Sequence, residues 1–144
     1  MLASGVFDLL HYGHVRYLEE AKKLGGEDSE LVVVVARDAT VRKRKGRDPI
    51  LPEEERRALV EALKPVNKAI LGEEDFSLEK VLSKVKPDIV AVGYDQEDLE
   101  AELKKVISRK GLDIKVVRLA RYCENSSSKI IREILERAAR MRAG

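Results

Sequence analysis

The sequence predicts an α/β fold in which helices cover a doubly wound parallel sheet, and three observations lead to this prediction. Short apolar segments alternate with amphipathic ones along the chain, a rhythm typical of strands joined by right-handed helical crossovers. The 144 residues are enough for one core, and no linker or repeat divides them, so we expect a single domain over 1–144. Every unusual loop follows a strand segment, which places these loops at one edge of the sheet.

The first half of the chain contains three expected strands and two expected helices. The strands are predicted over 1–6, 31–36 and 66–71. The first helix is predicted over 13–24, ends at Gly25 and Gly26, and has an apolar face made of Val15, Leu18, Ala21 and Leu24. The basic segment 42–47 is expected to be a loop, and Pro52 with three glutamates opens the second helix.

The second half continues the alternation. Strands are predicted over 88–92 and 114–119, and helices over 78–85 and 99–109, the latter stopped by Gly111. The last helix begins within 125–128, where a serine can cap it. We expect this helix to bury an apolar face that consists of Ile130, Ile131, Ile134, Leu135 and Ala138.

Composition narrows the class of protein. Hydrophobic residues make up 44% and charged residues 38% of the chain, which indicates a folded, soluble protein. No apolar run approaches the roughly 20 residues that span a bilayer, so we expect no membrane segment. The only cysteine, Cys123, has no partner within the chain, which predicts a cytoplasmic location. A net charge of +2 is too small to indicate a general nucleic-acid binder.

The stretch 4–14 is the most informative part of the chain because it contains both histidines, His11 and His14. Side chains three residues apart on a helical turn share a face, so both imidazoles can reach one ligand. Gly13 lets that ligand approach the backbone, and the start of a helix favours an anion. The stretch predicts a phosphate site, although a surface pair of histidines or half of a zinc site would have the same spacing.

Two further segments suit a polyphosphate, and each also has an ordinary structural explanation. Ser126, Ser127 and Ser128 stand at a helix start, where they can bind phosphate or serve as a plain N-cap. The basic segment 42–47 can meet phosphate groups or form a solvated surface. Attack on an α-phosphate needs positioning and charge stabilisation, and the acceptor supplies its own nucleophilic oxygen.

Two motifs in these stretches resemble those of a known family. Residues 5–8, GVFD, and residues 11–14, HYGH, resemble the GTFD and HxGH signature of the cytidylyltransferase-like nucleotidyltransferases. Residues 121–130 are similar to the RTEGISTTKI segment of the glycerol-3-phosphate cytidylyltransferases. The resemblance implies a Rossmann-like nucleotidyltransferase domain in which His11 and His14 are catalytic.

The middle of the chain points to one branch of that family. Residues 36–41, 45–54 and 63–72 look most like the archaeal FAD synthetases, and this resemblance covers nearly the whole chain. It implies transfer of AMP from ATP to FMN, with release of pyrophosphate and use of a divalent metal. Mg²⁺ is the expected metal because it suits phosphate oxygens. The alternative is a CTP-dependent glycerol-3-phosphate cytidylyltransferase.

The resemblance also implies roles for individual residues. It places the nucleotide contacts on Val6, Phe7, Gly13, Asp95, Arg121, Tyr122, Ser126, Ser127 and Ser128. It places the contacts with the acceptor or its phosphate on Lys43, Lys45 and Arg56. No residues are expected to form a dedicated metal site. Relatives in this family are commonly dimers, which implies a homodimer.

Four positions depart from the family patterns. Val6 replaces the threonine of GTFD and removes a hydroxyl near the phosphates. Asp95 matches the second acid of a GDDW-like segment, whereas Tyr94 and Gln96 differ from it, which argues against a cytidine pocket. Cys123 stands alone where the archaeal enzymes have more than one cysteine, so we expect it to act as a small apolar residue.

Overall fold

The computed structural model describes residues 1–75 and 77–143. Within these ranges, five parallel strands form one sheet in the order β3-β2-β1-β4-β5. The strands are β1 (Leu2–Gly5), β2 (Val32–Val35), β3 (Lys68–Leu71), β4 (Ile89–Val92) and β5 (Lys115–Arg118). The order reverses between β1 and β4, and doubly wound sheets bind ligands beyond the carboxyl ends of strands at this point. The predicted fold class is confirmed.

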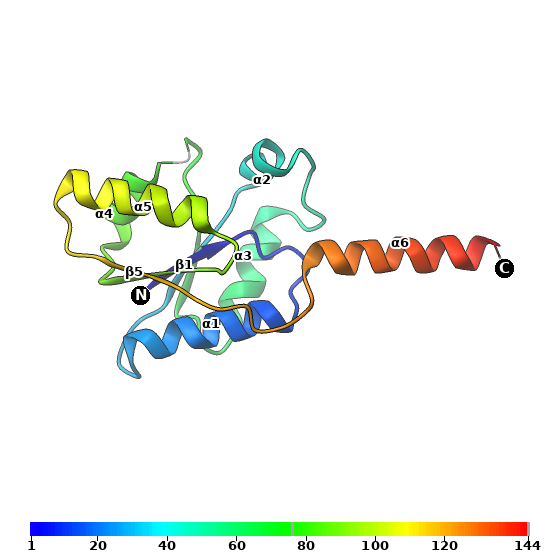
Figure 1. Ribbon diagram of the computed structural model, residues 1–144, viewed down its shortest axis with the longest axis horizontal. Coiled ribbons are helices and arrows are strands. Elements are labelled where there is room, and N and C mark those ends of the chain that lie inside the picture. The colour runs from blue at the N-terminus through cyan, green and yellow to red at the C-terminus, as the bar shows by residue number, and fades with distance from the viewer. Residues whose placement is uncertain (76, 144) are drawn as a thin grey trace.

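Helices cover both faces of the sheet, and the last helix extends away from it (Figure 1). They are α1 (Tyr12–Gly25), α2 (Asp38–Lys45), α3 (Glu53–Glu61), α4 (Leu78–Val85), α5 (Glu97–Lys110) and α6 (Ser127–Ala143). Leu18 of α1 and Val60 of α3 are fully buried in the core of one face. Leu82 of α4 and Leu103 of α5 belong to the core of the other face.

The valine run of β2 supplies both cores, as its unbroken apolar sequence predicts. Val33 and Val35 point to the core under α1 and α3, and Val34 belongs to the core under α4 and α5. Side chains along a strand alternate between faces, so a central parallel strand needs an apolar residue at every position.

The central strands β1 and β4 separate before their carboxyl ends. They pair only at Leu2 with Val90 and at Ala3 with Ala91, whereas β1 and β2 pair over four residues. Side chains satisfy the carbonyls that this separation frees. The Tyr17 hydroxyl donates to the carbonyl oxygen of Ala91 at 2.9 Å, and both it and Gln96 Nε2 lie 3.5 Å from that of Ser4. A crevice therefore opens at the switch point.

The basic segment after β2 is helical, so the expectation of a loop over 42–47 is wrong. Asp38 in the first turn and basic residues in the last turn of α2 complement the helix dipole. Gly46, with φ of 69°, ends the helix in the left-handed conformation. Only Val41 of α2 is buried. Because the helix has almost no apolar face, hydrophobic periodicity does not reveal it.

The expectation of a buried face on the last helix is also wrong. α6 begins at Ser127 as expected, but it extends away from the sheet and helices (Figure 1). Ile130 and Ile131 are half-buried near its start, and no residue of α6 is buried. The side chains of Ile134 and Leu135 are 58% and 64% exposed. The amphipathic pattern correctly predicts the helix but not the exposure of its apolar side.

Candidate active site

The loop between β1 and α1 adopts a conformation that side chains rarely take. Phe7 and Leu9 have φ values of 54° and 52°, in the left-handed region that usually requires glycine. Two contacts hold this loop in place. The buried Asp8 carboxylate accepts hydrogen bonds from the amides of Ile50 and Leu51 at 2.8 and 3.0 Å. Strained backbone of this kind is concentrated at ligand sites.

The two histidines form a capping box at the start of α1. His11 is the N-cap, and its Nδ1 accepts from the amide of Gly13 at 3.1 Å. His14 Nδ1 accepts from the amide of His11 at 3.2 Å, and the ring centroids are 3.9 Å apart. Because each Nδ1 is an acceptor, the proton of each neutral imidazole is on Nε2. The pair therefore offers two N–H donors to a ligand.

The surroundings keep both histidines neutral. Burial lowers the pKa of His11, and burial together with the charges of His11 and Lys45 lowers the pKa of His14 to about 4. The Asp8 carboxylate opposes this shift. Lys45, at the carboxyl end of α2, lines the same cavity as the histidine pair. At neutral pH both imidazoles are uncharged, and each has one N–H group, on Nε2.

Gly13 is required by its neighbours as well as by any ligand. A Cβ at this position would lie 2.8 Å from Cys123 Sγ and 2.8 Å from His11 Cε1. Both distances are too short for real side chains. The small residue at the start of α1 therefore lets the segment that carries Cys123 pack directly onto the histidine turn.

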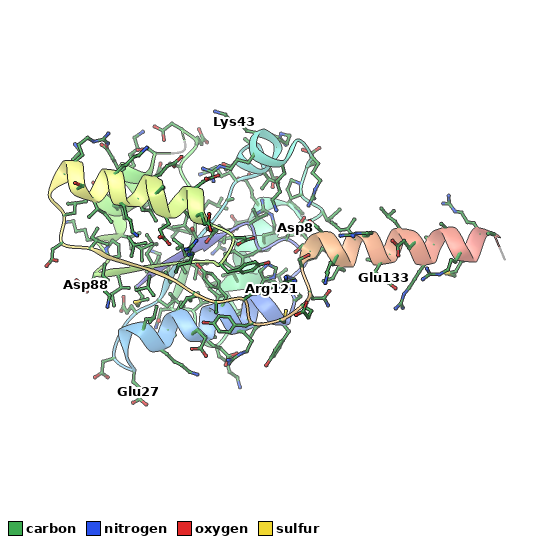
Figure 2. All side chains as sticks on the ribbon, viewed as in Figure 1. Asp8, Glu27, Lys43, Asp88, Arg121 and Glu133 are labelled. Carbon is green, nitrogen blue, oxygen red and sulfur yellow. The ribbon has the colours of Figure 1, made fainter. Side chains whose placement is uncertain are left out.

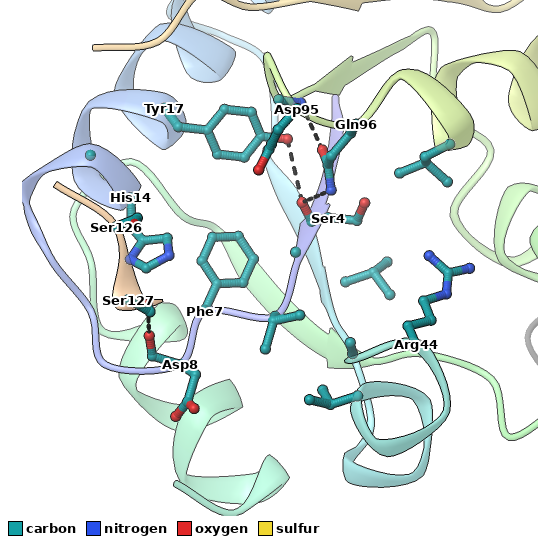
Figure 3. A pocket seen from close by; sticks show the side chains of 18 of the residues that line it. Ser4, Phe7, Asp8, His14, Tyr17, Arg44, Asp95, Gln96, Ser126 and Ser127 are labelled. Atoms are coloured by element: carbon teal, nitrogen blue, oxygen red, sulfur yellow. Dashed lines mark hydrogen bonds between the residues drawn. The ribbon is translucent and has the colours of Figure 1, made fainter. Parts of the chain in front are cut away.

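A cavity of about 500 Å³ occupies the crevice at the carboxyl ends of the strands. This volume is in the range of small-molecule sites. Most residues of the predicted site line it, namely Val6, Phe7, His11, Gly13, His14, Lys45, Asp95, Arg121, Tyr122, Ser126, Ser127 and Ser128. Figure 3 shows His14, Ser126 and Ser127 on one side of the end of β1 and Arg44 on the other.

The start of α6 is tied to the loop after β1. The Ser127 hydroxyl donates to the backbone carbonyl of Asp8, and Ser126 Oγ accepts from the amide of Lys129 at 3.1 Å. Ser126 is thus a helix cap that also lines the cavity, and phosphate binding by the serine run stays a prediction. The contact also sets the first turn of α6 beside the histidine turn (Figure 3). The two helix starts bring their N–H groups to one region of the cavity.

The segment before α6 forms the rest of this wall. Arg121 donates to the carbonyl oxygens of Cys123 and Glu124 at 2.9 and 2.7 Å, and its guanidinium lies 5.5 Å from the ring centroid of Tyr94. Arg121 therefore shapes its own loop while it lines the cavity. Gln96 holds the loop after β4, because its Oε1 accepts from the amide of Gly93 at 2.6 Å.

Two of the predicted residues lie elsewhere. Arg56 has a fully buried side chain outside the cavity lining, and its guanidinium donates to Asp38 at 2.6 Å. It also donates to three backbone carbonyls, those of Val6, Ala36 and Leu51. The expected phosphate contact does not fit this placement, and Arg56 instead holds the loops around the site. Lys43 lies on the outer surface of α2 (Figure 2) and does not line the cavity.

Sequence reasoning missed several cavity residues. They are Arg44, Tyr17, Glu73 and the apolar residues Val34, Leu78, Val81 and Leu99. A signal existed for Tyr17, which follows His14 by three residues and therefore lies on the same face of α1. The apolar residues read as ordinary core positions, and only the crevice between β1 and β4 exposes them. Over the described ranges, no three metal-ligating side chains come together and no helix could cross a membrane.

Comparison with known proteins extends the resemblance beyond the motifs. Residues 2–134 match the family model described as cytidylyltransferase-like. The chain belongs to this family. It is 47% identical over 136 residues to the FAD synthase of Korarchaeum cryptofilum and 51% identical over 140 residues to that of Methanopyrus kandleri. In both alignments, 94% of this chain and 91% of the relative are covered.

Two solved structures have a similar fold. The crystal structure of the lipopolysaccharide core biosynthesis protein from Thermoplasma volcanium matches with a TM-score of 0.76 at 50% identity, over 85% of this chain and 96% of that one. The pantothenate synthetase of Thermus thermophilus matches with a TM-score of 0.56 at 16% identity, over 85% and 55% of the two chains. The second match concerns the fold alone. Membership of the cytidylyltransferase-like family confirms the resemblance seen in the motifs.

Proposed function

We propose that this protein is an FMN adenylyltransferase, which transfers AMP from ATP to FMN and yields FAD and pyrophosphate. One observation carries the proposal. Relatives named FAD synthase are 47% and 51% identical to the chain, and each alignment covers 94% of it. The alternative, a glycerol-3-phosphate cytidylyltransferase, has no comparable support among these relatives.

The reaction needs no covalent intermediate with the protein. A phosphate oxygen of FMN attacks the α-phosphorus of ATP, a new P–O bond forms, and the bond from the α-phosphorus to the bridging oxygen of pyrophosphate breaks. The electron pair of that bond leaves with pyrophosphate. Negative charge grows on the α-phosphate oxygens and on the leaving group, so the protein contributes by positioning the reactants and stabilising charge.

The proposed roles follow from the wall that each residue occupies. The Nε2–H groups of His11 and His14 donate to phosphate oxygens at the reacting centre. Ser126, Ser127 and Ser128, with the amides of the first turn of α6, hold the leaving pyrophosphate. Lys45 approaches the same region from α2 and neutralises the phosphate groups that meet there. Asp95, Arg121 and Tyr122 lie along the wall proposed for the nucleoside.

A divalent cation, Mg²⁺ by default, is proposed to enter with ATP. Its hard-oxygen preference suits triphosphate oxygens and water. The carboxylates of Asp8, Glu73 and Asp95 line the cavity. Backbone amides already bind the Asp8 carboxylate, so Glu73 and Asp95 are the side chains that could hold such a cation or its water. When bound, the cation would neutralise charge on the triphosphate.

A matrix of four reactions tests the proposal. The purified protein is incubated with ATP or CTP, each with FMN or glycerol 3-phosphate, in Mg²⁺, and pyrophosphate and flavin products are measured. We expect pyrophosphate and FAD in equal amounts with ATP and FMN. Pyrophosphate release that requires CTP and glycerol 3-phosphate would overturn the proposal in favour of the cytidylyltransferase.

We also propose that the protein works in the cytoplasm as a homodimer. The single cysteine and the two nucleotide substrates support the location. The exposed apolar side chains of α6 support self-association, because a soluble chain seldom leaves such a stripe uncovered. No nucleic acid or membrane takes part in this proposal.

A further inference from the structure

The cavity has two ends of different chemistry. The end near α1 and α6 contains the histidine pair and the serines, with polar side chains and helix N-termini. The opposite end is walled by aliphatic side chains from β2, α2, α4 and α5. These are Val34, Val41, Leu78, Val81 and Leu99.

The apolar end is an opening into the core under α4 and α5. Val34 belongs to that core, and Leu78, Val81 and Leu99 pack against it. These last three side chains are only half-buried, although they have core neighbours. Walls from separate elements can enclose a flat apolar group and remove much of its surface from water. The lining also contains polar atoms. They come from Thr40, which precedes Val41 in the chain, and from Glu73 and Ser77, which lie before Leu78.

The geometry of phosphoryl transfer decides which substrate reaches this end. The attacking and leaving oxygens lie roughly in line on opposite sides of the transferred phosphorus. The leaving pyrophosphate is assigned to the start of α6, beside the histidine turn (Figure 3). The acceptor must therefore approach from the far side of the reacting centre, which is the side of α2, α4 and α5.

We infer that the apolar end binds the isoalloxazine ring of FMN, with Leu78, Val81 and Leu99 in contact with the ring, an inference that rests on the proposed function. The ring is flat and has a dimethylbenzene edge, which suits the aliphatic wall, and a polar pyrimidine edge, which suits Thr40, Glu73 or Ser77. The ribityl chain then runs towards Lys45 and delivers the phosphate to the reacting centre. This pocket selects the acceptor by its ring.

The test compares two truncations on one helix. Leu99→Ala removes part of the proposed ring contact from α5. Ile107→Ala is the matched control, because Ile107 is also half-buried on α5 and packs against the same core but does not line the cavity. Dissociation constants for FMN and riboflavin are measured by flavin fluorescence, together with KM for both substrates, kcat and the melting temperature.

We expect Leu99→Ala to raise KM for FMN and the dissociation constant for riboflavin by about tenfold, a size typical of lost apolar contacts in a pocket. KM for ATP should stay within about twofold, because the nucleotide binds at the other end. Ile107→Ala should lower the melting temperature without this effect on the flavins. Riboflavin is informative because it keeps the ring and lacks the phosphate.

A second variant covers the case in which Leu99→Ala does not fold. Val81→Phe fills the apolar end and is expected to abolish riboflavin binding while ATP still binds. If wild-type protein makes FAD but Leu99→Ala or Val81→Phe binds riboflavin with unchanged affinity, the ring site is overturned and the proposed function stands. If wild-type protein makes no FAD from ATP and FMN, the proposed function fails, and the ring assignment fails with it.

Discussion

The two nitrogens of His11 have separate tasks, and two substitutions can divide them. Nδ1 accepts the amide of Gly13 and caps α1, while Nε2 carries the donor proton towards the cavity. In His11→Asn, the amide oxygen can replace Nδ1, but nothing replaces Nε2. We expect this variant to keep its melting temperature and to lose about 100-fold in kcat, the usual scale for one charge-stabilising donor.

The complementary variant, His11→Gln, is the control. Its amide nitrogen reaches the position of Nε2 and can donate, but the cap at Nδ1 is lost. It should retain more activity than His11→Asn and show the lower melting temperature, since an N-cap contributes about 1 kcal/mol. Equal activity in the two variants would contradict the assignment of the proton to Nε2.

The lowered pKa of His14 makes the fold sensitive to acid. The unfolded chain protonates this histidine near its ordinary pKa of 6.5, whereas the folded chain does so only at about 4. Between these values the unfolded state binds more protons, so stability falls as pH falls. We expect the free energy of unfolding to drop by up to about 3 kcal/mol from this group.

Urea denaturation at several pH values between 7 and 4 measures this effect. Other groups titrate in the same range, so the useful quantity is the difference between wild-type protein and His14→Asn, which cannot titrate there. That difference should change across the interval from pH 6.5 to 4 and become constant below it. Parallel stability curves for the two proteins would show that the surroundings do not disfavour a charged His14.

Arg56 is predicted to matter for stability. Its buried guanidinium holds the carbonyl of Val6 beside the histidine loop and pairs with Asp38 at the start of α2. Arg56→Met would leave Asp38 and three carbonyls without this donor, which we expect to lower the free energy of unfolding by about 3 kcal/mol. Arg57→Met is the matched control, and its ion pairs with Glu54 and Glu61 lie at the surface. Its loss should lower the free energy of unfolding far less than Arg56→Met in the same denaturation measurement.

At the scale of elements, α2 presents two differently placed lysines. Lys45 lines the cavity, and its charge reaches His14, whereas Lys43 projects from the outer surface of α2 (Figure 2). We expect Lys45→Ala to lower kcat/KM by about tenfold or more, because a cation near the reacting phosphates is lost. Lys43→Ala, on the same helix, should stay within about twofold in the same assay. A larger loss in Lys43→Ala would place the wrong face of α2 at the site.

The elements that the sequence predicts well are those with a strong apolar pattern. The valines of β2 and the short helix α4 lie where their patterns place them. The sequence pattern does not reveal α2, because Val41 is its only buried residue. Its charged first and last turns, which complement the helix dipole, and the packing of Val41 stabilise this helix. For α6, periodicity correctly indicates one apolar side, but a local pattern contains no information about the surface that covers it.

At the scale of the whole molecule, the site exists because β1 and β4 part after two paired residues. Tyr17 and Gln96 bond the carbonyls that would otherwise continue the ladder, and the resulting crevice exposes aliphatic residues such as Val34. The motifs and their order along the sheet edge could be predicted from the sequence, and the phosphate chemistry stays a prediction. The apolar end of the cavity could not be predicted, because its residues come from four elements and have the pattern of ordinary core residues in each.

The final prediction concerns how α6 meets a second copy of the chain. Ile131, Ile134, Ala138 and Met141 follow the 4–3 spacing of a helix that pairs with another helix, and Met141 is 81% exposed. In an antiparallel pair about a two-fold axis, this apolar stripe of one copy would cover that of the other.

Sedimentation equilibrium should therefore find a dimer for wild-type protein. Ile134→Glu places a charge in the stripe and should yield a monomer with an unchanged far-ultraviolet circular dichroism spectrum of the folded sheet and helices. Arg137→Glu, on the same exposed helix but outside the apolar spacing, is the control and should remain dimeric or weaken only slightly. Because Ser127 at the start of α6 binds the Asp8 carbonyl beside the histidines, the monomer should also be less active. A dimer that survives in Ile134→Glu would place the interface on another surface of the molecule.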